Sequence, residues 1–171
     1  MRLLLAIALL GGGPPGLPPY PGPGPEPEET VPTIRARDLR GERHTVPDPT
    51  GLDPTLLVVA TGRHRPEDVV GWLEDAERYL PPGARTVLVL EADAERAREL
   101  IPARHWDQTV ADPEGGIAAE LGLRETRWPQ VYALDEVGRV LVGYQGRAGD
   151  PAARRVWAAI RPYPRPVWPV W

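Results

Sequence analysis

Apolar residues along this chain form two kinds of pattern, short continuous runs and stripes at helical spacing. Continuous runs at 56–61 and 85–91 predict two strands that are buried on both faces of a sheet. Between them, Pro66 opens a segment with apolar residues three or four positions apart: Val69, Leu73, Ala76 and Leu80. Because proline suits the first position of a helix, this segment predicts a helix that ends at the prolines 81–82.

The rest of the chain contains shorter elements. Residues 130–134 and 139–144 flank a turn-sized segment and predict an antiparallel hairpin. Further elements are expected as follows: a strand or hairpin arm at 33–39 and helices at 92–101, 117–121 and 151–160. The order β-β-α-β-α-α-β-β-α predicts an α/β fold with a parallel first part, followed by a hairpin and a helix.

Composition divides the chain into four segments. Residues 1–13 hold one Arg, eight consecutive apolar residues and then glycines, which resembles a short secretory signal peptide; a plain apolar terminus is the alternative. Residues 14–32 are rich in Pro and Gly and predict an extended linker. The domain covers 33–161. The tail 162–171, rich in Pro and Trp, either packs on this domain or docks on a partner or membrane interface.

These segments predict an extracytoplasmic protein, periplasmic or secreted; the alternative is a cytoplasmic one. A run of eight apolar residues is far shorter than the roughly 20 that span a bilayer, so we expect no membrane span in the mature chain. Peripheral association with a membrane stays open.

Several chemistries are excluded by residue types that the chain lacks. There is no Cys, which excludes thiol catalysis, disulfides and thiolate metal sites. There is no Ser and no Lys, which excludes a Ser-His-Asp hydrolase and a catalytic lysine amine. The net charge of -4 is spread without a basic block, so we expect no nucleic-acid partner.

Four short motifs along the chain occur in an order that is typical of one known superfamily. They are Asp38-Leu39-Arg40-Gly41-Glu42, the strand residues 57–61, the segment 112–123 that begins Asp-Pro-Glu-Gly, and the segment 128–140 that begins Trp-Pro-Gln-Val. Together they resemble the redoxin and peroxiredoxin-related branch of the thioredoxin-like superfamily. The resemblance implies an α/β three-layer sandwich with a mixed central sheet flanked by helices.

The resemblance also implies where an active site would lie. That branch places its cysteines at the turn between the first buried strand and the following helix. Here the turn reads Thr61-Gly62-Arg63-His64-Arg65-Pro66 and contains no cysteine. The fold therefore carries over, whereas thiol-disulfide exchange and cysteine peroxidase activity do not.

Two further residues follow from the same resemblance. Pro129 corresponds to a cis-proline that faces the turn; the alternative is an ordinary trans proline at the start of a strand. Trp128 precedes it and is expected beside the turn. It either fills the space left by the missing dithiol or forms an aromatic floor for a peptide or an arginine.

The turn itself offers positive charge at a helix start. Arg63 and Arg65 suit a phosphate, a carboxylate or an acidic partner; the alternative is that both are solvated. We expect His64 to be an exposed loop residue, because His44 and His105 are distant in sequence and no metal-ligand spacing occurs. No metal and no cofactor are expected.

The sequence thus predicts an exported, cysteine-free thioredoxin-like domain without thiol redox activity that serves as a binding or scaffolding module. Its partner is an unknown protein or a small anionic ligand. The alternative is a non-thiol enzyme or an anion-binding protein that uses Arg63, His64 and Arg65 at the helix start. A third hypothesis is a structural spacer between two proline-rich arms.

Overall fold

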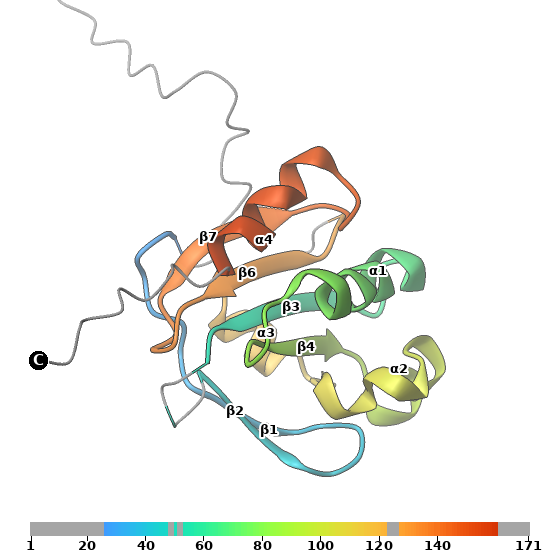
Figure 1. The fold of residues 1–171 in the computed structure, drawn as a ribbon. Coiled ribbons are helices and arrows are strands. Elements are labelled where there is room, and N and C mark those ends of the chain that lie inside the picture. The colour runs from blue at the N-terminus through green and yellow to red at the C-terminus, as the bar shows by residue number, and fades with distance from the viewer. Residues whose placement is uncertain (1–25, 48–49, 51–52, 123–126, 161–171) are drawn as a thin grey trace, which may run out of the picture.

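The computed structural model describes residues 26–47, 50, 53–122 and 127–160 (Figure 1). At its centre is a mixed sheet with the strand order β5-β4-β3-β6-β7. The strands are β3 (Thr55–Thr61), β4 (Arg85–Glu91), β5 (Thr109–Ala111), β6 (Gln130–Leu134) and β7 (Val140–Gln145). β3, β4 and β5 are parallel, and β6 and β7 continue the sheet in antiparallel pairs. The predicted α/β fold with a mixed central sheet is confirmed.

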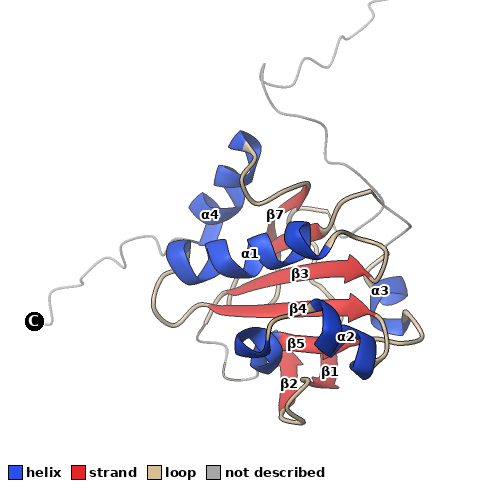
Figure 2. Ribbon diagram, turned by 90° about the vertical axis from the view of Figure 1, so that its right-hand side faces the viewer, coloured by secondary structure: helices blue, strands red, loops and turns tan. Residues whose placement is uncertain are grey.

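Helices and a small hairpin cover the two faces of this sheet (Figure 2). One face packs against α1 (Pro66–Tyr79), α2 (Ala94–Leu100) and α4 (Arg154–Ile160). The other face packs against α3 (Gly116–Glu120) and the hairpin of β1 (Ile34–Arg37) and β2 (Arg43–Val46). Two short 3-10 helices, η1 (Ala103–Gln108) and η2 (Pro151–Ala153), precede β5 and α4.

The central strand β3 explains why the sequence shows a continuous apolar run at 56–61. Leu56, Val58 and Ala60 face the core under α1, α2 and α4. Leu57 and Val59 face the second core under the hairpin and α3. A strand covered on both sides needs apolar residues at every position, so it lacks the alternation of a half-exposed strand.

Three findings differ from the sequence prediction or extend it. β2 and β5 had not been assigned as strands. Residues before 33, which we gave to the linker, also belong to the domain: Val31 is only 3% exposed, and Glu28 N–H donates to the Val140 carbonyl at 2.8 Å. The predicted segments 1–13 and 162–171 lie outside the described residues.

Among the helices that the structure describes, none is long and apolar enough to cross a membrane.

The sheet brings three chain segments to one edge. Val59 near the end of β3 pairs with Gln130 at the start of β6, and Gln130 pairs with Gln145 at the end of β7. The turn after β3, the residues before β6 and the residues after β7 therefore lie next to one another. The predicted site residues come from the first two of these segments.

Candidate functional site

The β3–α1 turn (Thr61–Arg65) uses its own polar groups to close on itself. The Thr61 N–H donates to His64 Nδ1 at 3.0 Å, and the His64 N–H donates back to the Thr61 carbonyl at 3.1 Å. The Arg63 N–H lies 3.4 Å from Thr61 Oγ1. The Gly62 N–H donates to the Glu91 carbonyl of the neighbouring strand at 3.0 Å. These four amides are thus already paired inside the protein.

His64 is buried, with 8% of its surface exposed, so the prediction of an exposed loop histidine is wrong. The physical reason is the Thr61 amide, which sits at the end of a buried strand and needs an acceptor. Because Nδ1 accepts this hydrogen bond, the proton of the neutral ring is on Nε2. The imidazole therefore holds the turn together through one of its two nitrogens.

The start of α1 presents few amide donors to a ligand. Pro66 has no N–H, and the Asp68 N–H donates to the Arg65 carbonyl at 3.0 Å. Arg65 is the N-cap residue, and its side chain makes no capping hydrogen bond. Glu67 and Asp68 place acidic groups in the first turn of the helix. Those carboxylates complement the helix dipole, and they also reduce its attraction for a small anion. This end of the helix exposes the guanidinium groups of Arg63 and Arg65 together with the carboxylate of Glu67.

A cluster of Asp68, Arg127, Trp128 and Arg147, here called the arginine–tryptophan cluster, adjoins the turn. Arg147 Nε lies 2.9 Å from Oδ1 of Asp68, whose side chain is only 9% exposed. The Arg147 guanidinium lies over the Trp128 ring at 4.5 Å from its centroid, and the Arg127 guanidinium lies over it at 5.0 Å. Arg147 thereby connects the first turn of α1 with the segment before β6.

This cluster bears on the two alternatives for Trp128. The indole is half-buried, and two arginines lie over its ring. This arrangement agrees with the alternative in which Trp128 forms an aromatic floor for an arginine. Sequence reasoning named Trp128 but gave Asp68 no part in the site. It missed Arg127, although this residue directly precedes Trp128, and it missed Arg147, which nothing local distinguishes from the other arginines of this chain.

The cis-proline prediction for Pro129 is wrong. The cis peptide bond within the described residues joins Val46 to Pro47, and the bond between Trp128 and Pro129 is trans. Pro129 directly precedes β6, a place where the missing N–H removes no ladder bond. Its carbonyl accepts the Gly146 N–H at 3.3 Å and so extends the pairing of β6 with β7.

The two other histidines, His44 and His105, lie apart from the β3–α1 turn and from each other. His44 Nε2 lies 2.9 Å from Oδ2 of the buried Asp38. Burial alone would raise the pKa of Asp38, but hydrogen bonds from His44 and from backbone amides outweigh it and lower that pKa. His105 is fully buried, and burial lowers its pKa. In the part of the chain that the structure describes, no three His, Asp or Glu side chains are grouped to hold a metal ion.

Comparison with known proteins gives the class of fold. No family model and no curated protein matches the sequence. Solved structures do match. Peroxidoxin BcpB from Mycobacterium tuberculosis is 16% identical, with a TM-score of 0.64, and the match covers 80% of this chain and 97% of that one. The thioredoxin domain of a thiol-disulfide oxidoreductase from Bacteroides vulgatus is 14% identical, with a TM-score of 0.64. That match covers 79% of this chain and 98% of the other.

A third neighbour is StoA from Bacillus subtilis, which is 17% identical, with a TM-score of 0.58. The match covers 77% of this chain and 99% of StoA. At these identities the likeness shows the fold alone. The protein has a thioredoxin-like fold, and its structural neighbours are thioredoxin-like proteins of the redoxin, peroxiredoxin and thiol-disulfide oxidoreductase kinds. It has this fold without a single cysteine, which is consistent with an absence of thiol redox activity.

Proposed function

We propose that this protein is an extracytoplasmic thioredoxin-like module that binds a protein partner without thiol chemistry. The observation that carries the proposal is the arginine–tryptophan cluster next to the β3–α1 turn. Beside the turn where the resemblance places the cysteines of a thiol enzyme, this chain has an indole with two guanidinium groups over it. Such a surface offers flat aromatic area and fixed positive charge, both of which are common at protein interfaces.

The partner segment that fits this surface is acidic. Arg63, Arg65 and Arg127 are exposed, and Arg147 is half-exposed beside them. Guanidinium groups pair with carboxylates through two parallel hydrogen bonds, and an aromatic floor excludes water from one side of such a contact. Export is supported by the signal-like residues 1–13.

An oligo-glutamate peptide is a defined probe for this proposal. We expect wild type to bind it at low salt, and binding to weaken as salt rises. The double variant Arg65→Ala with Arg127→Ala should bind about tenfold more weakly, since two exposed charge contacts are each worth about 0.5–1 kcal/mol. The control, Arg35→Ala with Arg96→Ala, removes the same charge elsewhere and should lose much less. Equal losses in the two variants would contradict the proposed surface.

The alternative, a small-anion site or non-thiol enzyme at Arg63, His64 and Arg65, has less support. The amides of the turn are paired internally, and His64 is buried with Nδ1 already accepting a hydrogen bond. Thermal unfolding with phosphate and with acetate separates the two ideas. We expect no ligand-dependent shift in wild type; a shift that is lost in Arg63→Ala and in His64→Ala would favour the alternative instead.

A further inference from the structure

Several contacts hold the side chain of Arg147 in place. Its Nε lies 2.9 Å from Oδ1 of Asp68, and its guanidinium lies over the Trp128 ring at 4.5 Å from the centroid. In the described part of the chain, its two terminal nitrogens make no hydrogen bond. A guanidinium whose terminal edge is open can receive a carboxylate through two parallel hydrogen bonds.

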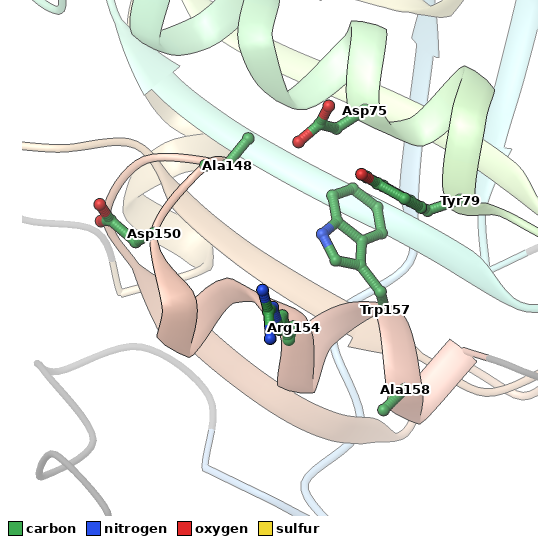
Figure 3. A pocket seen from close by; sticks show the side chains of 8 residues that line it. Asp75, Tyr79, Ala148, Asp150, Arg154, Trp157 and Ala158 are labelled. Atoms are coloured by element: carbon green, nitrogen blue, oxygen red, sulfur yellow. The ribbon is translucent and has the colours of Figure 1, made fainter.

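The backbone of Arg147 is fixed as well. Its N–H donates to Asp150 Oδ2 at 3.0 Å, and the same oxygen accepts the Tyr144 hydroxyl at 3.0 Å. Figure 3 shows Asp150 on the loop that leads into η2, where it lines a groove of about 450 Å³ between α1 and α4 together with Asp75 and Tyr79. Because both its backbone and its side chain are held, Arg147 has little conformational freedom left to lose when a ligand binds.

The first turn of α1 carries two carboxylates in different surroundings. Glu67 is exposed, and its side chain makes no hydrogen bond or ion pair in the part of the chain that the structure describes. The Asp68 side chain is only 9% exposed and pairs with Arg147. Through long-range electrostatics alone, both carboxylates would repel an acidic ligand on the neighbouring surface. Asp68 has a second and opposite effect, because it contacts Nε and leaves the terminal edge of the guanidinium open.

We propose that Asp68 is a positioning residue for acidic ligands: it holds Arg147 on Trp128 so that the two terminal nitrogens receive a carboxylate of the partner. This inference rests on the proposed function, because it concerns the same surface and the same class of partner. It adds that an acidic residue of this surface promotes the binding of acidic segments. Arg65 is exposed and has no such support among the described residues, so it contributes charge without a fixed geometry.

The experiment compares Asp68→Asn with Glu67→Gln, measured with the oligo-glutamate peptide at low salt. Each variant removes one negative charge from the same helical turn, and Glu67→Gln is the matched control. We expect Glu67→Gln to bind the peptide equally well or up to about twofold more tightly, because a repulsive charge is gone. Asp68→Asn should bind it about two- to fivefold more weakly, because the loss of positioning outweighs the loss of repulsion.

A further variant shows whether Asp68 acts through Arg147. In an Arg147→Gln background the guanidinium is absent, so Asp68→Asn should no longer weaken binding and should have the same effect as Glu67→Gln. A merely structural role of Asp68 would weaken binding in both backgrounds. If circular dichroism shows Asp68→Asn to be unfolded, Arg147→Lys and Arg65→Lys take its place. Both keep the positive charge, and we expect only Arg147→Lys to bind about two- to fivefold more weakly.

Three results would overturn this inference and leave the proposed surface intact. The first is tighter binding by Asp68→Asn, equal to that of Glu67→Gln. The second is a loss through Asp68→Asn that persists in the Arg147→Gln background. The third is an equal effect of the two lysine variants. A wild-type protein that does not bind the peptide would overturn the proposed function itself, and this inference with it.

Discussion

The two ends of helix α1 use polar and aromatic side chains in opposite ways. At the N-terminal end, the amides and the imidazole of the β3–α1 turn bond one another, and Asp68 holds Arg147 over Trp128. At the C-terminal end, Tyr79 and Trp157 border a groove, and two carboxylates face it. The end where the resemblance predicts an active site is therefore a closed turn with charge around it. The C-terminal end instead borders an open groove that aromatic and acidic side chains line together.

Trp72 joins the two ends, and its removal should have the largest effect. The ring is fully buried between Tyr144 and Trp157, and its N–H donates to the Gly146 carbonyl at 2.9 Å. Trp72→Ala should lower the free energy of unfolding by about 3–5 kcal/mol, measured by urea denaturation. The control Val137→Ala, at a position 58% exposed, should change it by less than about 0.5 kcal/mol. A loss below about 1 kcal/mol for Trp72→Ala would contradict the packing of this ring between the two ends.

A smaller effect should distinguish the two ends, because the side-chain coupling at only one of them depends on salt. A double-mutant cycle on Asp68→Ala and Arg147→Ala should give a coupling of about 0.5–1 kcal/mol, because the arginine is half-exposed. This coupling should fall at roughly 1 M salt. A cycle on Tyr79→Ala and Trp157→Ala should give a coupling that salt changes little, since no charge is involved. The same salt dependence in both cycles would contradict the contrast between the two ends.

A further effect concerns alkaline stability through Tyr144, which lies between the two ends. Burial, and then the hydrogen bond to Asp150, raise the pKa of Tyr144 to about 12. An unfolded chain ionises tyrosine near pH ~10, so the stabilising contribution is complete below that pH and is lost as pH rises toward 12. Urea unfolding between these pH values should therefore show falling stability that is less steep in Tyr144→Phe. An absorbance titration in which every tyrosine ionises near pH ~10 would contradict this prediction.

Much of the fold could be predicted because the sequence patterns that indicate each strand or helix lie within that element. The run at 56–61 is apolar at every position, since both faces of β3 are covered. Pro66 marks the start of α1, where it has the first helical position. The strand β5 is only three residues long, so it leaves too short a pattern to be recognised. The early start of the domain at Val31 was missed because proline-rich composition hides a single core residue.

The candidate site could be predicted less well because its contacts are long-range. Trp128 was placed beside the β3–α1 turn by resemblance, but its partner Arg147 reaches it only when β6 and β7 pair. The burial of His64 depends on one backbone amide, that of Thr61, which sequence alone does not show to need an acceptor. The cis form of Pro129 was expected from resemblance alone, and a strand start accepts the trans form equally well.

The most direct test of the central claim, a thioredoxin-like fold without thiol chemistry, is an insulin-reduction assay with a matched gain-of-function control. His64 and Glu67 are three positions apart and span the start of α1, so His64→Cys with Glu67→Cys recreates a Cys-x-x-Cys spacing at a helix N-terminus. We expect wild type to stay at the buffer rate and the double variant to reduce insulin above it. Clear turnover by the wild-type protein, with insulin or with peroxide, would contradict the account.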